Sequence, residues 1–338
     1  MEEVIKKIKK ENKIPYKNKT FQFATDCSGI EMPLNAFKAL GLKYNVVFSS
    51  DIDKNCKDYI IKNHKPNKFY DNIKQRKNKD YTNVPIDFYV AGFPCQTFSS
   101  LGRNEGFDNE KKGQIFFDVF NFIKTNRPKV FILENVRHLT FHDKGNTFKV
   151  IQKYLKKLKD YDVKWKLLNT KDYGIPQTRT RIYIIGIKKS LIKKPFEFPK
   201  EYQIKKGAHA LLSKSANKTI KPRHKEKLKQ IFQKHPQLRN KNYIINLNFS
   251  SMDWFRKGQE DLCPCLVTSC DFYSTKDKRY ITPYEALRFQ GILKKDLKQF
   301  KPYSDNVIYK FAGNTMSANV LAWIFVNILN SVNFAKKN

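Results

Sequence analysis

The chain has 338 residues, with 66 lysines and arginines against 31 aspartates and glutamates, which gives a formal net charge of +35. A field of this size attracts polyanions, and nucleic acid is the first class of partner to consider, although an AT-rich genome accounts for part of the lysine excess. Six scattered cysteines are too few for a disulfide framework in a chain this long, so we expect a reduced, intracellular protein. No apolar run approaches bilayer length and the basic first 20 residues lack an apolar core, so we expect neither a membrane span nor a secretory signal.

Strands and helices alternate over the first 190 residues. The predicted strands are residues 20–24, 46–50, 69–70, 86–90, 130–133, 165–168 and 181–187. The predicted helices are residues 32–40, a helix through residues 59–61, and residues 115–124 and 147–158. This alternation is typical of a parallel α/β sheet. Residues 190–245 are less periodic, whereas residues 319–332 form an apolar helix that we expect to pack on the first sheet.

Cys95 follows a proline where a predicted strand ends and a polar loop, residues 97–109, begins. Proline fixes φ and donates no backbone hydrogen bond, so the strand should stop at Pro94. Open α/β sheets place their chemistry at the carboxyl ends of strands, where a thiol can attack an electrophile. Free cysteine is also among the most buried residue types, so this segment alone leaves a nucleophile and a core residue as alternatives.

Acidic turns follow three successive predicted strands: Asp26 near Gly29, then Asp51, then Asp71. In a doubly wound sheet the second acid is placed to accept hydrogen bonds from ribose hydroxyls, and the third to meet the amine of an adenine. Neither a dinucleotide-binding glycine pattern nor a P-loop is present, so an adenosine ligand without a pyrophosphate fits better. This favours S-adenosylmethionine as cofactor, with helix capping by these aspartates as the alternative.

Glu134 ends the strand expected next to that of Cys95, and Arg179 and Arg181 alternate before a further apolar run. If Cys95 adds to C6 of a pyrimidine, a carboxyl group near N3 meets the electron demand of the ring, and burial raises the pKa of such a carboxyl. An arginine near O2 orients the base, and alternation on one strand would put both arginines on the same side. The alternatives are a surface ion pair for the arginines and, for Glu134, a charge near a helix start capped by Asn135.

Three cysteines, Cys263, Cys265 and Cys270, lie close together in the less regular part of the chain. They lack paired C-x-x-C spacing and no nearby histidine completes a set of ligands. We therefore expect no metal site.

Together these motifs resemble the DNA (cytosine-5) methyltransferases, in the compact form of bacterial and viral modification enzymes. The matching segments are residues 92–96 (Gly-Phe-Pro-Cys-Gln), 134–136 (Glu-Asn-Val), 172–181 (Asp-Tyr-Gly-Ile-Pro-Gln-Thr-Arg-Thr-Arg), 282–291 (Thr-Pro-Tyr-Glu-Ala-Leu-Arg-Phe-Gln-Gly) and 313–315 (Gly-Asn-Thr). The resemblance covers residues 21–186 and 279–329 in the order of the family. It implies a Rossmann-like, S-adenosylmethionine-dependent methyltransferase sheet with a smaller, irregular target-recognition domain.

By this resemblance the chain methylates C5 of a cytosine in double-stranded DNA. Cys95 is the nucleophile, Glu134 contacts N3 and the exocyclic amine, Arg181 contacts O2, and Arg179 assists. The cytosine must leave the helix, because a thiol and a methyl donor cannot reach C6 and C5 inside a stacked pair.

The resemblance also implies a set of cofactor-binding residues: Cys27, Gly29, Asp51, Ile52, Asp71, Pro94, Ile115 and Asn314. The first motif departs from the pattern of the family at two positions. Thr25 stands where an acid is usual, and Glu31 replaces a small residue.

We expect a catalytic and cofactor-binding domain over residues 1–189, a target-recognition domain over residues 190–278, and a segment over residues 279–338 that returns to the first domain. We expect a monomer in the cytoplasm or nucleoid, or in the host cell if the source is viral. The alternatives are the same chemistry on transfer RNA, whose Cys-Phe-Thr signature is absent here, and a non-catalytic nucleic-acid-binding protein.

Overall fold

The computed structural model describes residues 1–338 except 95–113, 204–205, 214–218, 249–259, 270 and 337–338. The chain divides into two compact units. The sheet unit comprises Lys7–Leu168, Thr180–Lys200 and Leu321–Asn338, and the second unit comprises Met1–Lys6, Asn169–Arg179 and Glu201–Val320. The domain boundaries expected from the sequence stay a prediction, because compactness does not show which part folds alone.

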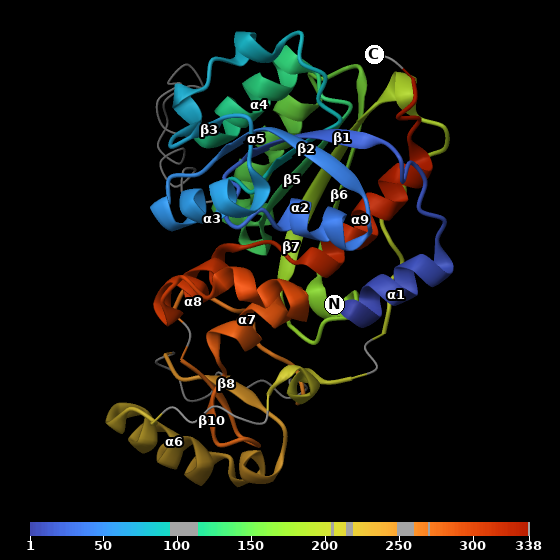
Figure 1. The fold of residues 1–338 in the computed structure, drawn as a ribbon. Coiled ribbons are helices and arrows are strands. Elements are labelled where there is room, and N and C mark those ends of the chain that lie inside the picture. The colour runs from blue at the N-terminus through green and yellow to red at the C-terminus, as the bar shows by residue number, and fades with distance from the viewer. Residues whose placement is uncertain (95–113, 204–205, 214–218, 249–259, 270, 337–338) are drawn as a thin grey trace. The chain divides into compact units, whose positions relative to one another are not determined.

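The sheet unit is built on seven strands in the order β3-β2-β1-β4-β5-β7-β6 (Figure 1). Their bounds are β1 Thr20–Asp26, β2 Lys43–Ser50, β3 Phe69–Tyr70, β4 Phe88–Ala91, β5 Val130–Val136, β6 Tyr161–Asn169 and β7 Thr180–Lys188. The expected parallel α/β sheet is confirmed for β1 to β5, but β7 pairs with β5 in the antiparallel direction. The short segment between β6 and β7 holds no crossover helix, which a parallel connection requires.

Helices cover both faces of this sheet (Figure 1). They are α2 Met32–Ala39, α3 Lys54–His64, α4 Gln114–Asn126, α5 Asn146–Leu155 and α9 Ala318–Ser331. Successive residues of a strand point to opposite faces. Phe88 therefore packs against Phe37 of α2 and Phe325 of α9, with ring centroids 5.7 and 5.4 Å away, whereas Tyr89 packs against Phe122 of α4 at 4.6 Å. The expectation that the last helix returns to the first sheet is confirmed.

The second unit carries a three-stranded antiparallel sheet in the order β10-β9-β8, with a small core of its own. Its elements are α6 Pro222–Lys234, β8 Ile244–Asn246, β9 Phe272–Ser274, β10 Arg279–Tyr280, α7 Pro283–Phe289 and α8 Asp305–Asn314. Helix α7 begins at Pro283, where Thr282 and Glu285 form a capping box. The N-terminal helix α1, Glu2–Glu11, has residues in both units.

Short 3-10 helices connect many of these elements: η1 Ile73–Gln75, η2 Asn78–Tyr81, η4 Arg137–Thr140, η5 His142–Gly145, η6 Thr170–Asp172, η7 Lys189–Leu191, η8 Ala208–Leu211, η9 Pro236–Asn240 and η11 Lys294–Phe300. In the part of the chain that the structure describes, no single helix is long and apolar enough to cross a membrane. The bent pair α8 and α9 meets that test of length and composition only when its two helices are taken together.

A buried ion pair joins the end of β1 to the segment after β3. Arg76 Nη2 lies 2.7 Å from Asp26 Oδ2, and neither side chain is exposed. Tyr89 Oη donates to the same carboxylate oxygen at 2.6 Å, and the guanidinium lies 4.1 Å from the ring centroid of Phe122. The first of the three acidic turns thus contributes a structural residue, because Asp26 is fully enclosed by protein groups.

We expect Arg76→Ala to lower the free energy of unfolding by about 3–5 kcal/mol, because it leaves the Asp26 carboxylate buried without its partner. Urea denaturation measures this change. The control is Arg127→Ala, whose ion pair with Asp160 spans 2.7 Å between side chains that are 38% and 48% exposed. That variant should cost less than about 1 kcal/mol, and equal costs for the two variants would contradict the role of the buried pair.

Candidate active site

Glu134 and Arg181 meet across the antiparallel pair β5 and β7. The register sets Arg181 opposite Val136, two residues beyond Glu134, so the two side chains lie on the same face of the sheet. Arg181 Nε lies 3.4 Å from Glu134 Oε1, and the side chains are 13% and 11% exposed. Arg181 Nη1 also donates to the carbonyl oxygen of Thr180 at 2.9 Å. The structure therefore brings together two of the side chains that the sequence assigned to the target base, in a half-buried position.

Asn135 fixes the end of β4 beside this pair. Its Nδ2 donates to the carbonyl oxygen of Phe93 at 2.7 Å, and the side chain is buried. Phe93 is itself buried and packs against Phe116, with ring centroids 5.6 Å apart. The idea that Asn135 caps a following helix is wrong, because Val136 occupies the cap position of η4. Asn135 instead positions the backbone just before the exposed Pro94.

Cys95 and the loop over residues 97–109 lie outside the described residues. Their assignment as nucleophile and closing loop stays a prediction. The structure does describe the segments around them. These are β4, the hydrogen bond between Asn135 and Phe93, and the pair of Glu134 on β5 and Arg181 on β7.

Arg179 does not share a strand with Arg181, so that expectation is wrong: β7 begins at Thr180. The Arg179 side chain is buried in the second unit, where its guanidinium donates to three carbonyl oxygens. These belong to Leu266 at 3.0 Å, Gly313 at 3.1 Å and Thr315 at 2.6 Å. Arg179 thereby ties the segment before β7 to the Gly-Asn-Thr motif.

The absence of a side chain at Gly313 permits this arrangement. A Cβ atom there would lie 2.4 Å from the backbone carbon of Val267, which is closer than real Cβ contacts allow. Two segments that the sequence marked separately, residues 172–181 and 313–315, therefore meet within the second unit.

The turn after β1 is held by Asp51. Asp51 Oδ2 accepts a hydrogen bond from the backbone N–H of Gly29 at 2.8 Å, and Oδ1 accepts one from that of Asp53 at 2.9 Å. Gly29 has φ of 55° and Cys27 has φ of 52°, so the turn uses the left-handed region twice. Burial raises the pKa of the Asp51 carboxyl. The helix cap of α3 is Asp53, whose side chain accepts from two backbone N–H groups, so capping does not explain Asp51.

Other expected cofactor residues surround this edge of the sheet. Ile52 is 82% exposed, which is unusual for an isoleucine beside a buried strand. Asp71 is exposed after β3, and Lys57 Nζ lies 2.8 Å from its Oδ1. Ile115 is half-buried at the start of α4. Asn314 belongs to the second unit, so its place at the cofactor stays a prediction.

Glu31 places its carboxylate against Thr25, the position at which the family usually has an acid. This contact was not predicted from the sequence. Glu31 Oε1 accepts hydrogen bonds from Thr25 Oγ1 and Ser49 Oγ, both at 2.6 Å. The side chain is fully buried, and Oε2 has no partner among the described residues. Glu31 has φ of 52°, which turns it back toward the end of β1. The sequence did contain an indication of this contact. Thr25 replaces the usual acid of the family, and Glu31 supplies an acid six residues later.

We expect Glu31→Gln to change how stability depends on pH. Burial raises the pKa of Glu31 from 4.5 to about 7, so the folded state binds this proton more tightly than the unfolded chain. That contribution to stability is complete below pH 4.5 and is lost as the pH rises through about 7. Glutamine does not titrate, so the free energy of unfolding of the variant should rise by up to about 3 kcal/mol relative to that of the wild type between pH 4.5 and 8.

Urea denaturation across this pH range measures the difference. The control is Glu197→Gln, an exposed side chain, whose curve should follow that of the wild type. If the curve of Glu31→Gln also runs parallel to that of the wild type, the buried carboxyl does not titrate as described.

Among the described residues, no group of three or more His, Cys, Asp and Glu side chains is arranged to hold a metal ion. Cys263 is buried and Cys265 is half-buried, and Cys270 lies outside the described part of the chain.

Residues 19–330 match the family model of the C-5 cytosine-specific DNA methylases. The chain is 35% identical over 328 residues to the type II methyltransferase M.HaeII of Haemophilus aegyptius, covering 94% of this chain and 95% of that protein. It is 34% identical over 310 residues to M1.ScrFI of Lactococcus lactis subsp. cremoris, covering 87% of this chain and 75% of the relative.

Solved structures with the same fold include Dnmt2 methyltransferase of S. pombe, with a TM-score of 0.66 and 16% identity over 92% of this chain and 99% of that one. Methyltransferase EhMeth of Entamoeba histolytica aligns with a TM-score of 0.63 and 19% identity over 92% and 98%. These two similarities confirm the Rossmann-like α/β fold with a small additional sheet. On the family match and the relatives, the chain belongs to the C-5 cytosine-specific DNA methylases and is a DNA (cytosine-5)-methyltransferase that uses S-adenosylmethionine.

Proposed function

We propose that this chain methylates a cytosine turned out of duplex DNA, with Cys95 as the nucleophile. The observation that carries this proposal is the Glu134–Arg181 pair, 3.4 Å apart on strands beside the segment that leads to Cys95. An acid and a guanidinium fixed this way match the two polar edges of a cytosine, N3 with its amine and O2. Asn135, bound to the carbonyl oxygen of Phe93, keeps the nucleophile segment in register with that pair.

The proposed chemistry follows from these assigned roles. The Cys95 thiolate forms a bond to C6, and Glu134 supplies a proton or short hydrogen bond at N3 while Arg181 holds O2. The electron pair of the C5–C6 double bond then becomes available at C5, where the methyl group is received. Water then takes the proton from C5, and the C–H electron pair re-forms the C5–C6 double bond as the C6–S bond breaks and the thiolate of Cys95 leaves. The base must first leave the stack, since C6 is not accessible within it.

The residues that follow β1, β2 and β3 suit an adenosine ligand. Each oxygen of Asp51 already accepts one backbone hydrogen bond, and each keeps a second lone pair for a ribose hydroxyl. The exposed Ile52 offers an apolar surface for the adenine, and Asp71 an acceptor for its amine. S-adenosylmethionine supplies the methyl group when bound there. The remaining proposed cofactor residues are Cys27, Gly29, Pro94, Ile115 and Asn314.

Arg179 takes a positioning role in this proposal. Its guanidinium already serves three carbonyl oxygens, so it orders the segment that enters β7 and hence the start of the strand that carries Arg181. Residues 190–278 would recognise the target, with basic and amide side chains on phosphates and base edges. We further propose that the enzyme acts as a monomer, without a metal, inside the cell.

We expect purified protein to transfer tritium from labelled S-adenosylmethionine into 5-methylcytosine of cytosine-containing duplex DNA, but not of transfer RNA. Cys95→Ser should abolish the label, because a hydroxyl is a far weaker nucleophile than a thiolate, while DNA binding remains. Cys56→Ala, which removes a buried thiol of α3, is the control and should keep its activity. Label in transfer RNA alone would contradict the DNA substrate, and full activity of Cys95→Ser would contradict the mechanism.

We expect Asp51→Asn to raise the Kd for S-adenosylmethionine by about 10- to 100-fold, because charge-assisted hydrogen bonds to the ribose are lost. Calorimetric titration measures the Kd without DNA. Asp58→Asn, on the exposed side of α3, is the control and should bind as the wild type does. An unchanged Kd for Asp51→Asn would show that the Asp51 carboxylate does not bind the ribose.

A further inference from the structure

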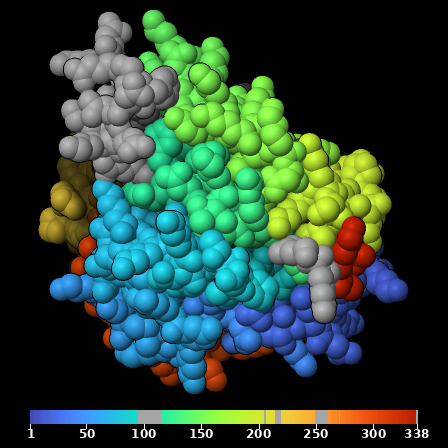
Figure 2. All heavy atoms as spheres, turned by 90° about the horizontal axis from the view of Figure 1, so that it is seen from above, coloured from blue at the N-terminus to red at the C-terminus, as the bar shows by residue number. Residues whose placement is uncertain are grey.

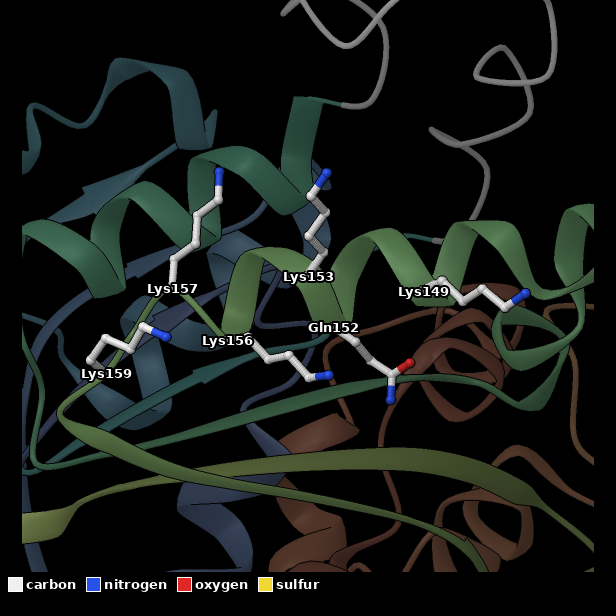
Figure 3. A pocket seen from close by; sticks show the side chains of 6 residues that line it. All are labelled: Lys149, Gln152, Lys153, Lys156, Lys157 and Lys159. Carbon is white, nitrogen blue, oxygen red and sulfur yellow. The ribbon is translucent and has the colours of Figure 1, made fainter.

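A row of lysines lines a hollow on the outer surface of α5 and of the turn that follows it. The cavity holds about 440 Å³ and is lined by Lys149, Gln152, Lys153, Lys156, Lys157 and Lys159. Figure 3 shows the five lysine side chains extending outward from the helix and the turn, with their amino groups apart from one another. In Figure 2 residues in the green range of the colour bar, which includes α5, lie on the outer surface.

The sequence of α5 places these lysines outward. Phe148, Ile151 and Leu155 form the buried stripe of the helix, with a spacing of three and four residues. Lys149, Lys153 and Lys156 follow the same spacing on the exposed side. The lysines are thus fixed relative to one another by a helix whose other face is anchored in the core.

No carboxylate neutralises this row among the described residues. The acids nearest in sequence have other partners: Asp160 pairs with Arg127 at 2.7 Å, and Asp162 lies 4.0 Å from Lys164. Lys157 Nζ lies over the ring of Tyr154, 4.2 Å from its centroid. Like charges three and four residues apart on a helix repel each other, so the row is destabilising unless an anion binds.

An aromatic cavity of about 450 Å³ adjoins the lysine row and shares Gln152, Lys156 and Lys159 with it. Its apolar lining includes Phe148, Leu155, Tyr161, Trp165 and Ile184. Trp165 is 45% exposed and packs edge-on against Phe148, with ring centroids 4.9 Å apart. An exposed indole beside several ammonium groups is the combination that binds single-stranded nucleic acid, with a base on the ring and phosphates on the lysines.

Along the chain, the segment before α5 leads back to β5, the strand that carries Glu134. The helices η4 and η5 connect β5 to α5 and carry further basic and aromatic groups. Phe141 is 53% exposed, and its ring centroid lies 4.7 Å from that of His138. Basic and aromatic residues therefore follow one another along the chain from η4 to the end of α5.

We propose that this hollow, the lysine row of α5 with Trp165 and its apolar lining, is a second binding surface for the DNA substrate that holds unpaired strand outside the target site. The proposal rests on the proposed position of the target cytosine at Glu134 and Arg181. The lysines bind the phosphates, and the indole of Trp165 stacks with a base.

The test compares two double variants with the same change in charge. The first variant, Lys153→Glu with Lys156→Glu, reverses two charges at the centre of the row. The control, Lys10→Glu with Lys17→Glu, reverses the charges of two exposed lysines elsewhere in the sheet unit. Binding of a target duplex with a single-stranded flank is measured from 50 to 200 mM salt. We expect the α5 variant to bind this DNA at least about tenfold more weakly than the wild type. Its slope of log K against log salt concentration should be smaller by about two, whereas the affinity of the control should change by less than about threefold.

Two readouts separate this surface from the catalytic site. The Kd for S-adenosylmethionine and the rate at saturating DNA should stay unchanged in the α5 variant. Oligothymidylate should quench tryptophan fluorescence in the wild type but not in Trp165→Phe, because stacking quenches an indole.

Each outcome decides the proposal. Equal loss of binding in both double variants would overturn it, because the effect would then reflect net charge alone. Quenching by polyglutamate but not by oligothymidylate would also overturn it, in favour of an acidic protein partner. If the wild type does not methylate DNA, the proposed function fails, whereas methylation with an α5 variant that behaves as its control rejects the second surface alone.

Discussion

The antiparallel pairing of β7 with β5 is the constraint on which the candidate active site depends. It sets Arg181 opposite Val136 and hence on the same side as Glu134, two residues away. A shift of one residue in this register would turn Arg181 to the other face of the sheet. The apolar residues of β7 prevent such a shift, because the run from Ile182 to Ile185 is buried. Packing in the core therefore fixes the distance between the two charged groups that we propose meet the base.

The other half of the site depends on the end of β1, where neighbouring residues serve different faces of the sheet. Asp26 turns to one face and is neutralised by Arg76, while Thr25 turns to the other and binds Glu31. Between these networks the chain makes the turn that presents Gly29 to Asp51. Two buried carboxyl groups thus support the half-buried turn in which the Gly29 N–H donates to Asp51.

Much of the fold and part of the site could be predicted from the sequence. The strands of the sheet have strong local patterns, and a carboxylate at the end of β2 or β5 is read directly from the chain. The antiparallel direction of β7 was missed, because the alternation of strands and helices in the earlier part of the unit was extended to the whole sheet, although no helix is predicted between residues 168 and 181. Arg179 was placed on the strand of Arg181 by spacing alone, although its three carbonyl partners come from segments more than 80 residues away.

Glu31 and Asn135 show the same limit at the level of single side chains. The left-handed backbone at Glu31 turns its carboxyl group toward Thr25, and no local propensity indicates that conformation for a glutamate. Asn135 binds the carbonyl oxygen of Phe93, which follows β4 and lies 42 residues away in the sequence, whereas its sequence context indicated a helix cap. Both are tertiary contacts, and a pattern in one segment does not contain them.

The most direct measurement of the central claim is a covalent trap. A target duplex that carries 5-fluorocytosine can accept the thiol at C6 and the methyl group at C5, but it cannot lose fluorine as a cation, so the ring cannot be restored and the adduct persists. With S-adenosylmethionine present, we expect a stable protein–DNA complex whose peptide mass maps the bond to Cys95. Attachment at another residue, or no complex despite methylation of the ordinary duplex, would contradict nucleophilic catalysis by Cys95.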